Sequence, residues 1–439
     1  MDVFLMIKKV FHIYSSKMYT PLNKIKFRLN RVQYGKNFRS KGMIYIYRHY
    51  ESAKILIGNN VSINSASWAN PIGCGDKTYF QVNENGTVKI WGTDMEHWAE
   101  VKTDNAYNTQ PGVLGIDIED IKIISKMSGE VTLEDMATED VEMNKINIMC
   151  GKKIVTIPRH HNTDVFLPSM DESENKIMSV KENWLLETVV NLNTYTADND
   201  NQKMMQVFNF NTKEKRVEAL DGHRIGMRTL ENQTIYETTE NPFDTVKIHN
   251  KCVPVFKKIM DKKSEKEIEI YQDKKYIRLK GNDFTYMIRR IDGEYFKVEQ
   301  MLDASFDYIF VPDRVQILEA MKYDTELRKA SGADKKPVIL HSENQKLYSY
   351  IAAGKYEAFD EFETSGNNME DNFYIGFDPQ FLTDAFNIVD SDKPICFGTN
   401  NKAPLFINGN EYKILILPVN IGNGDCSAEF TKRIKSKVA

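Results

Sequence analysis

Apolar and polar residues alternate in short runs through most of the chain, a pattern typical of β-strands. Two stretches, 180–192 and 311–322, instead place apolar residues three and four positions apart, as an amphipathic helix does. Pro312 falls in the first turn of the second stretch, where its missing N–H has no helical partner. The pattern therefore predicts an α+β fold with few helices and many antiparallel strands.

The same order of elements returns along the chain. A helix is predicted at 116–127, at 250–262 and at 378–389, and each is followed by a polar break and three short strands. The predicted strands are 131–133, 146–149, 154–157, 267–270, 276–279, 284–288, 395–397, 404–407 and 413–417. The repeat length of about 130 residues is that of a domain and is too long for a solenoid unit.

One corner of the predicted sheet has an unusual composition. A strand over 216–220 runs into Asp221-Gly222, a strong signal for a tight turn, because glycine accepts positive φ without a steric cost. The chain leaves through His223, Arg224 and Ile225 into a second strand. By itself the pattern also fits an ordinary strand corner.

Three motifs in the right order give this corner a family resemblance. Asp-Gly-His-Arg followed by an aliphatic residue resembles the signature in the middle domain of the bacterial DNA polymerase III β subunit, the sliding clamp. Residues 93–96, Thr-Asp-Met-Glu, follow a predicted hairpin over 79–92 and resemble Thr-Asp-Leu-Glu in the first clamp domain. The apolar stretch 414–419 resembles the segment that ends sliding clamps. The resemblance covers about residues 79–421.

The resemblance implies a fold and a function. The fold would consist of repeated DNA-clamp domains, each with two helices packed on antiparallel sheets, in a head-to-tail homodimeric ring around duplex DNA. Such a ring is a processivity factor: it tethers DNA polymerase III during DNA replication and catalyses nothing. The helix at 116–127 and its strands would supply one edge of the ring. The expected divisions are an atypical region 1–78, domains 79–170, 171–299 and 300–421, and a tail 422–439.

In the family, the corner and the C-terminal strand lie side by side and form a pocket for short peptides rich in Gln, Leu and Phe. The peptides belong to the polymerase catalytic subunit, the clamp loader and repair proteins. Carried over by position, the pocket residues are Met204, Leu220, Gly222, His223, Arg224, Ile225, Phe296, Met301, Leu415, Leu417, Pro418 and Val419. Met204 is expected on the strand before the corner, and Phe296 and Met301 after the last strand of the domain. Two or three anchoring aliphatic side chains would give micromolar binding.

Lys251, Lys258 and Lys262 are expected on one face of the helix at 250–262, where they would meet DNA phosphates without reading bases. A lysine stripe of this kind also fits a solvated helix face. The chain departs from the family at Phe296, commonly Pro, and at Asn420, often Arg. Its basic tail would cover the pocket, contact DNA or be disordered.

Residues 43–90 have a second resemblance. Ile55 to Ile63, with 70–73 and 88–90, resemble coils of the left-handed β-helix of hexapeptide-repeat acyltransferases. The likeness stops near Ile90 and lacks the catalytic part of that family. Either residues 43–90 supply the missing strand and helix of the first clamp domain, or the chain is a fusion with a truncated clamp. A truncated clamp would bind peptides without closing a ring.

Composition fits this interpretation. The chain has 439 residues, a formal charge of -4 and a pI of about 6.1, so any DNA contact has to come from a local surface. The five cysteines are far apart and the N-terminus lacks a signal peptide or membrane span, which predicts a cytoplasmic protein without disulfides or zinc. No nucleophile–base spacing and no phosphate-binding glycine loop is present, so we expect neither an enzyme nor a cofactor.

Overall fold

A computed structural model describes most of the chain from residue 176 onward and shorter stretches before it. The described residues are 21–22, 24–25, 33–34, 39–41, 56–57, 62–64, 77–82, 88–93, 96–103, 112–136, 145–159, 176–198, 202–236, 245–302, 306–332, 336–371 and 373–421. The chain forms two compact units. The first comprises residues 1–98 and 104–166, and the second comprises residues 99–103 and 167–439.

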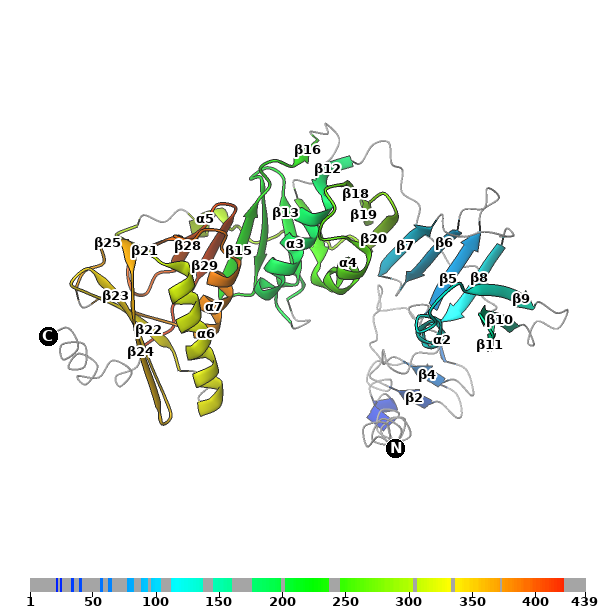
Figure 1. The fold of residues 1–439 in the computed structure, drawn as a ribbon, viewed down its shortest axis with the longest axis horizontal. Coiled ribbons are helices and arrows are strands. Elements are labelled where there is room, and N and C mark those ends of the chain that lie inside the picture. The colour runs from blue at the N-terminus through cyan, green and yellow to red at the C-terminus, as the bar shows by residue number, and fades with distance from the viewer. Residues whose placement is uncertain are drawn as a thin grey trace. The chain divides into compact units, whose positions relative to one another are not determined.

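The second unit contains one structural plan twice (Figure 1). The first copy consists of β12 (Lys176–Lys181), α3 (Glu182–Leu192), β13 (Val207–Asn211), β14 (Arg216–Leu220), β15 (Arg224–Thr229), β16 (Thr234–Ile235), β17 (Thr245–His249), α4 (Val253–Ile259), β18 (Glu267–Gln272), β19 (Tyr276–Lys280) and β20 (Phe284–Arg289). The second copy consists of β21 (Tyr308–Pro312), α6 (Arg314–Ser331), β22 (Val338–Glu343), β23 (Lys346–Ala353), β24 (Tyr356–Phe362), β25 (Thr364–Asn367), β26 (Phe373–Phe377), α7 (Pro379–Ile388), β27 (Ile395–Gly398), β28 (Leu405–Asn408) and β29 (Tyr412–Ile416). The short helix α5 (Glu299–Leu302) lies in the connection between the copies.

Strand pairing is the same in both copies. The strands of the first copy run in the orders β16-β12-β18-β19-β20 and β17-β13-β14-β15, and those of the second in the orders β25-β21-β27-β28-β29 and β26-β22-β23-β24. β15 pairs antiparallel with β29, so that one sheet continues from the first copy into the second. The copies are therefore joined by backbone hydrogen bonds as well as by the connection that contains α5.

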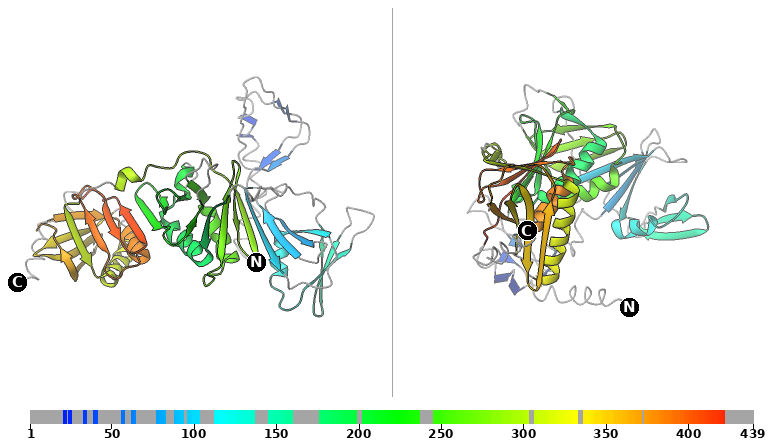
Figure 2. Two further views of the ribbon diagram at one scale, coloured as in Figure 1. Left: turned by 90° about the horizontal axis from the view of Figure 1, so that it is seen from above. Right: turned by 60° about the vertical axis from the view of Figure 1, so that its left-hand side comes forward.

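Each copy places a pair of helices on its sheets. Helix α3 contacts α4 in the first copy, and α6 contacts α7 and the strands β23 and β24 in the second (Figure 2). The apolar positions that predict the helix at 180–192 face this core: Leu185 and Val189 are fully buried. Complete burial of one such side chain stabilises the fold by about 1.5–3 kcal/mol. The helical periodicity in the sequence therefore correctly predicts which face of α3 packs against the core.

Local signals fix where the helices of the second copy begin and end. Asp313 and Asp378 are the N-caps of α6 and α7, and their carboxylates accept hydrogen bonds from the backbone N–H groups of Gln316 and Gln380. Helix α6 continues past the predicted end at residue 322 and stops at Gly332, which has a φ of 67°. The glycine, and not the end of the apolar pattern, terminates the helix.

The two other predicted helices are shorter than expected. Within 250–262, residues Asn250–Cys252 form a 3-10 turn and only Val253–Ile259 are α-helical, because Pro254 has no N–H for the preceding turn. Within 116–127, only Ile118–Ile124 form the helix α2. Ile116 belongs instead to the preceding strand and pairs with Thr78.

The described part of the first unit follows the same plan from the counterpart of β13 onward. Its elements are β5 (Lys77–Val82), β6 (Val88–Thr93), β8 (Gly112–Asp117), α2, β9 (Thr132–Met136), β10 (Lys145–Cys150) and β11 (Lys153–Pro158), and β7 (His97–Thr103) begins in this unit while its residues 99–103 belong to the second. β5 pairs antiparallel with β6 and β8, and β10 pairs antiparallel with β9 and β11. This order matches β13-β14-β15-β17-α4-β18-β19-β20. Counterparts of β12 and α3 are not among the described residues.

The hexapeptide interpretation is wrong for residues 88–90, because these lie in the antiparallel hairpin β5–β6 and not in a parallel coil. Upstream, β1 (Gln33–Tyr34) pairs parallel with β3 (Leu56–Ile57), and β2 (Arg39–Lys41) pairs parallel with β4 (Ser62–Asn64). Parallel pairing of very short strands is compatible with a β-helix coil. Residues 70–73, the turn at 83–86, His160, His161 and the tail 422–439 lie outside the described residues.

Candidate functional site

The corner between β14 and β15 is held by a single carboxylate. Oδ1 of Asp221 accepts hydrogen bonds from the backbone N–H groups of His223 (2.9 Å) and Arg224 (3.1 Å), which closes an Asx turn. Gly222 has a φ of 92°, in the region that favours glycine. The Asp-Gly pair thus makes the tight turn that its sequence predicts, and it leaves Gly222 and His223 exposed.

The structure brings this corner beside the C-terminal strand. Arg224 is paired with Ile416 and Ile225 with Leu415 in the antiparallel ladder between β15 and β29. The backbone N–H of Leu417 donates to the carbonyl of His223 at 2.9 Å. Two segments almost two hundred residues apart are therefore neighbours, as the resemblance implies (Figure 1).

One face of this junction is apolar. Leu220, Ile225 and Leu415 are all at least 95% buried and pack in one cluster. The other buried members of the cluster are Met227, Val298 and Phe406, with Met205, Tyr295, Leu302 and Phe397 partly buried around them. Phe406 is the cross-strand partner of Leu415, so β28 extends the apolar face beyond the predicted residues.

Large apolar side chains remain exposed at the edge of the junction. Leu417 is 40% exposed, Val419 37%, Phe296 37% and Met301 49%. Pro418, between Leu417 and Val419, is half-buried. The backbone N–H of Val419 donates to the carbonyl of Gly376 at 2.9 Å. Exposed apolar side chains that border a buried apolar cluster are typical of a surface that binds a partner.

One predicted position lies elsewhere than expected. Met204 is in the 3-10 helix Lys203–Met205 and not on a strand, and its terminal methyl lies against Gly293. Its neighbour Met205 contacts the apolar cluster and approaches Gly222. Met301 lies after the last strand of the copy, β20, as expected, and is on the short helix α5. Consecutive residues in a tight helix point in different directions, so the sequence match selected the wrong methionine for contact with the cluster.

Arg224 is separate from the apolar cluster. Consecutive residues of a strand point to opposite faces of the sheet, so the side chain of Arg224 lies on the face opposite to that of Ile225. Its side chain is 9% exposed, and its Nε donates to Oδ2 of Asp221 at 2.9 Å while Nη1 donates to Oδ2 of Asp384 on α7. Burial lowers the pKa of Arg224, but hydrogen bonds to Asp384 and Asp221 outweigh it and the net pKa is raised.

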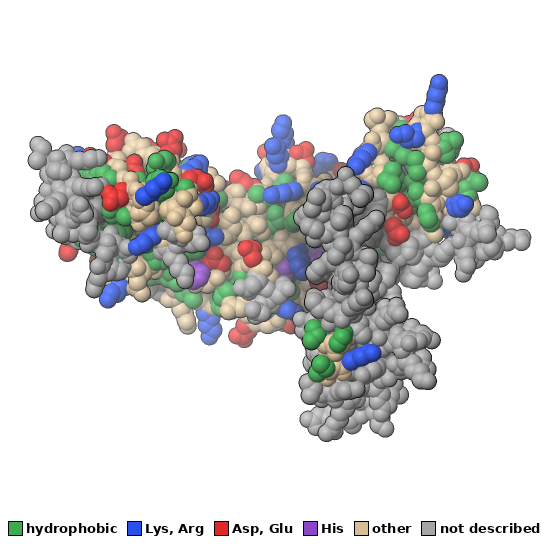
Figure 3. All heavy atoms as spheres, turned by 90° about the horizontal axis from the view of Figure 1, so that it is seen from below, with side chains coloured by type: hydrophobic (Ala, Val, Ile, Leu, Met, Phe, Trp, Pro, Cys, Tyr) green, Lys and Arg blue, Asp and Glu red, His purple; other side chains and the backbone are tan. Residues whose placement is uncertain are grey.

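The predicted lysine stripe is not on one helix. Lys251 lies in the 3-10 turn, Lys258 in α4 and Lys262 in the turn beyond its end, and all three are exposed. Lys262 borders a cavity of about 950 Å³ between α3 and the end of α4, together with Lys257. On the face that Figure 3 shows, Lys and Arg side chains are interspersed with Asp and Glu. The helix-stripe geometry is therefore wrong, because Lys251 precedes α4 and Lys262 follows it.

The described residues contain no group of three or more His, Cys, Asp or Glu side chains able to hold a metal ion. Among the same residues, no helix is long and apolar enough to cross a membrane. Cys252 and Cys396 are buried free thiols, and burial raises the pKa of both.

The known proteins to which the chain is similar are bacterial sliding clamps. No family model matches the chain. The β sliding clamp of Lactococcus lactis is 21% identical over 341 residues, covering 71% of this chain and 82% of the relative, and that of Pseudomonas aeruginosa is 22% identical over 321 residues with the same coverage. The structure of a putative DNA polymerase III β subunit from Eubacterium rectale is 26% identical, covers 80% of this chain and 93% of its own, and superposes with a TM-score of 0.69.

The chain is similar to the bacterial β sliding clamps in sequence and in fold. The Bacillus subtilis sliding clamp, at 16% identity, shows the same fold with a TM-score of 0.70 over 81% of this chain and 94% of its own. The Helicobacter pylori β clamp, at 14% identity, superposes with a TM-score of 0.66 over 80% of this chain and 94% of its own, and was solved bound to a DNA ligase peptide. The resemblance seen in the three sequence motifs is thereby confirmed, and with it the α+β clamp fold.

Proposed function

We propose that the chain is a sliding clamp, a non-catalytic processivity factor that tethers DNA polymerase III and other replication or repair proteins to duplex DNA. The observation that carries the proposal is the junction of β15 and β29, where buried Leu220, Ile225 and Leu415 underlie exposed Leu417 and Val419. The ligase peptide on the Helicobacter pylori clamp supports a peptide-binding role for such proteins. The three domains would be 79–170, 171–299 and 300–421.

The pocket would use hydrophobic anchoring. Aliphatic and aromatic side chains of a Gln-Leu-x-Leu-Phe-type peptide would cover Leu417, Val419, Phe296 and Met301 and remove their exposed area from water. Each well-buried side chain contributes about 1.5–3 kcal/mol before the cost of ordering, which leads to micromolar affinity. Gly222 and His223 would border the peptide with their backbone.

The internal repeat suggests how a ring would close. β15 of one copy pairs with the last strand, β29, of the next. β24 is the counterpart of β15 and β11 is the counterpart of β20 and β29, and each has a single strand partner among the described residues. We infer that β24 of one protomer pairs with β11 of a second, which gives a head-to-tail homodimer. Ile154 on β11 is 66% exposed and would be covered there.

DNA binding would be independent of sequence. Lys251, Lys258 and Lys262 are exposed on the helical side of the first copy and would contact phosphates. Because these lysines follow a 3-10 turn, a short helix and a turn, they present separate charges rather than a single stripe.

A second candidate is a clamp that binds peptides but does not encircle DNA. It is favoured by one observation: the short strands described before β5 pair in parallel, β1 with β3 and β2 with β4, whereas β13 is preceded by the antiparallel strand β12 and the helix α3. Particle mass separates the candidates, because a closed dimer is twice 50.8 kDa and an open protomer is not. An acyltransferase activity of the N-terminal region is the least supported alternative, and we expect no turnover of acetyl-CoA.

The test of the proposal is a titration of a fluorescent Gln-Leu-x-Leu-Phe peptide followed by anisotropy. We expect saturable micromolar binding, and Leu417→Ala should weaken it about 5- to 30-fold, since removal of part of a leucine side chain from an apolar contact costs about 1–2 kcal/mol. Val315→Ala on α6 is the matched control, because Val315 is also aliphatic and 55% exposed but lies away from the junction. Equal loss in both variants, or no binding by the folded protein, would refute the pocket.

A further inference from the structure

Arg224 connects three segments that meet at the junction. Its Nε and Nη1 donate to Asp221 at the corner and to Asp384 on α7, at 2.9 and 2.5 Å. Its Nη2 donates to the carbonyl of Thr194, in the 3-10 helix Asn193–Tyr195 that follows α3. All three guanidinium nitrogens thus donate inside the protein, to partners from both structural copies.

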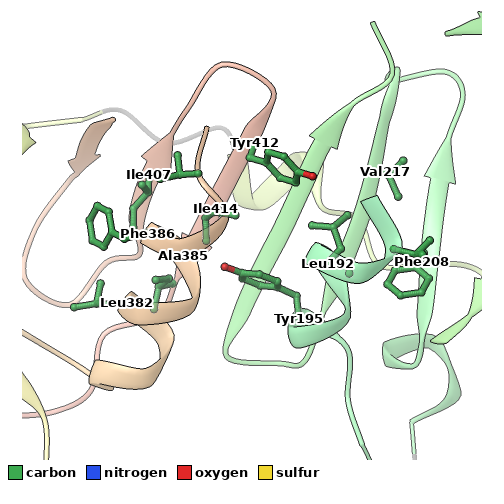
Figure 4. Packing of buried hydrophobic residues seen from close by; sticks show 14 of the residues in the cluster. Leu192, Tyr195, Phe208, Val217, Leu382, Ala385, Phe386, Ile407, Tyr412 and Ile414 are labelled. Atoms are coloured by element: carbon green, nitrogen blue, oxygen red, sulfur yellow. The ribbon is translucent and has the colours of Figure 1, made fainter. Parts of the chain in front are cut away.

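Two aromatic rings flank the guanidinium. Its central carbon lies 5.0 Å from the ring centre of Tyr195 and 4.3 Å from that of Phe381 on α7. Phe381 also stacks on His223, with ring centres 6.1 Å apart. Tyr195 points from the first copy toward α7 of the second, in the direction of Ala385 (Figure 4). The rings exclude water and strengthen the charge pairs between them.

We propose that Arg224 and Asp384 form a latch that positions the corner and the C-terminal strand for peptide binding, and that Arg224 is not itself a peptide contact. The inference rests on the proposed peptide-binding function. The latch fixes the Asp221 turn, and thereby His223, whose carbonyl receives the N–H of Leu417. Asp384 is a positioning residue that the family motifs do not mark.

The geometry of the Arg224–Asp384 pair requires an arginine, because the positive charge of a lysine at this position would not make the same contacts. Asp384 uses its second oxygen to accept a hydrogen bond from Gln380 Nε2 at 2.8 Å, so its carboxylate is fixed on both sides. A planar guanidinium reaches Asp221, Asp384 and Thr194 at once, whereas a lysine ammonium is a compact point charge on a flexible stem. Loss of Asp384 leaves Arg224 with Asp221 as its remaining carboxylate partner, and loss of Arg224 leaves the Asp384 carboxylate without this cation.

The experiment is a double-mutant cycle on peptide affinity with Arg224→Gln, Asp384→Asn and the combination. We expect each single variant to bind about tenfold more weakly, and the double variant to bind about as weakly as the singles, because coupled residues are not additive. Arg224→Lys should lose affinity as well. Glu326→Gln, an exposed carboxylate change on α6, should bind like the parent protein.

A direct contact of Arg224 with the peptide predicts a different result. Asp384→Asn would then bind like the parent protein while Arg224→Gln loses affinity, and losses in the double variant would follow Arg224→Gln alone. That outcome would overturn the latch. If Arg224→Gln does not fold, the Arg224→Lys and Asp384→Asn pair still distinguishes the two results.

Hydrogen exchange of the free protein tests the latch independently of the proposed peptide-binding function. The latch predicts faster exchange in residues 220–227 and 414–419 of Asp384→Asn than of the parent protein, with no change in Glu326→Gln. If the parent protein binds no peptide but this acceleration occurs, the proposed function fails and the latch holds as a structural device. Unchanged exchange in Asp384→Asn overturns the latch whether or not peptides bind.

Discussion

Asp324 on α6 is expected to make the protein less stable as the pH rises. Its side chain is 1% exposed, and neither carboxylate oxygen has a hydrogen-bond partner among the residues that the structure describes. Burial, and secondarily the charge of Asp360, raises the pKa of Asp324 from 3.8 to about 7. The folded protein therefore keeps this proton at a pH where the unfolded chain has lost it.

The sign and size follow from proton linkage. Below pH 4 the carboxyl is protonated in both states and has no effect on stability. Between about pH 4 and pH 7 the unfolded state binds fewer protons, so the free energy of unfolding falls as the pH rises. At about 1.4 kcal/mol per pH unit, the loss between pH 5 and pH 7 is about 3 kcal/mol, and above pH 7 it levels off.

Asp324→Asn removes this dependence while preserving shape. We expect the variant to be more stable than the parent protein at pH 8 by about 4 kcal/mol, and the difference to shrink to about 1–2 kcal/mol at pH 5. Urea unfolding followed by circular dichroism at both pH values measures it. Glu326→Gln, on the same helix but exposed, is the control and should show no pH-dependent difference. A constant difference for Asp324→Asn across this range would refute the argument.

Three further predictions concern the ring, the DNA surface and the junction. Ile154→Asp should shift the protein from a dimer to a monomer in light scattering at micromolar concentration, because a charge would be buried at the inferred β11–β24 contact; an unchanged dimer would contradict that contact. Lys251→Gln should lower the slope of log affinity for duplex DNA against log salt by about 0.9, and an unchanged slope would remove this lysine from the interface. Gly226→Ala should destabilise the fold by about 1–3 kcal/mol, because a Cβ there would lie 2.8 Å from the ring of Tyr195, whereas Gly366→Ala meets no atom within 4 Å and should be near neutral in thermal unfolding.

Much of the fold is readable from local patterns. Alternation identifies the strands, and helical spacing identifies the core face of α3 through Leu185 and Val189. Helix ends were less predictable, because they depend on single residues such as Pro254 and Gly332 more than on the apolar pattern. The repeat is also visible in the sequence, but which strands correspond between the copies is known only from the strand pairing in the structure.

The candidate site was predictable in part. The adjacency of residues 219–227 and 414–419 follows from the family motifs, and the alternation of faces already separates Arg224 from Ile225. The contribution of Phe406 depends on cross-strand register, which one sequence does not specify. Asp384 lies 160 residues from Arg224, and no short-range pattern marks the pair. Sequence motifs therefore locate the junction but not the contacts that hold it.

The most direct test of the central claim is hydrogen exchange of the full chain with and without a saturating Gln-Leu-x-Leu-Phe peptide. We expect protection confined to residues 217–227, 295–302 and 414–419, the segments that form the apolar junction. The same peptide with its Leu and Phe replaced by Ala should protect none of them. Protection on another surface, with these three segments unchanged, would contradict the assignment of the peptide site.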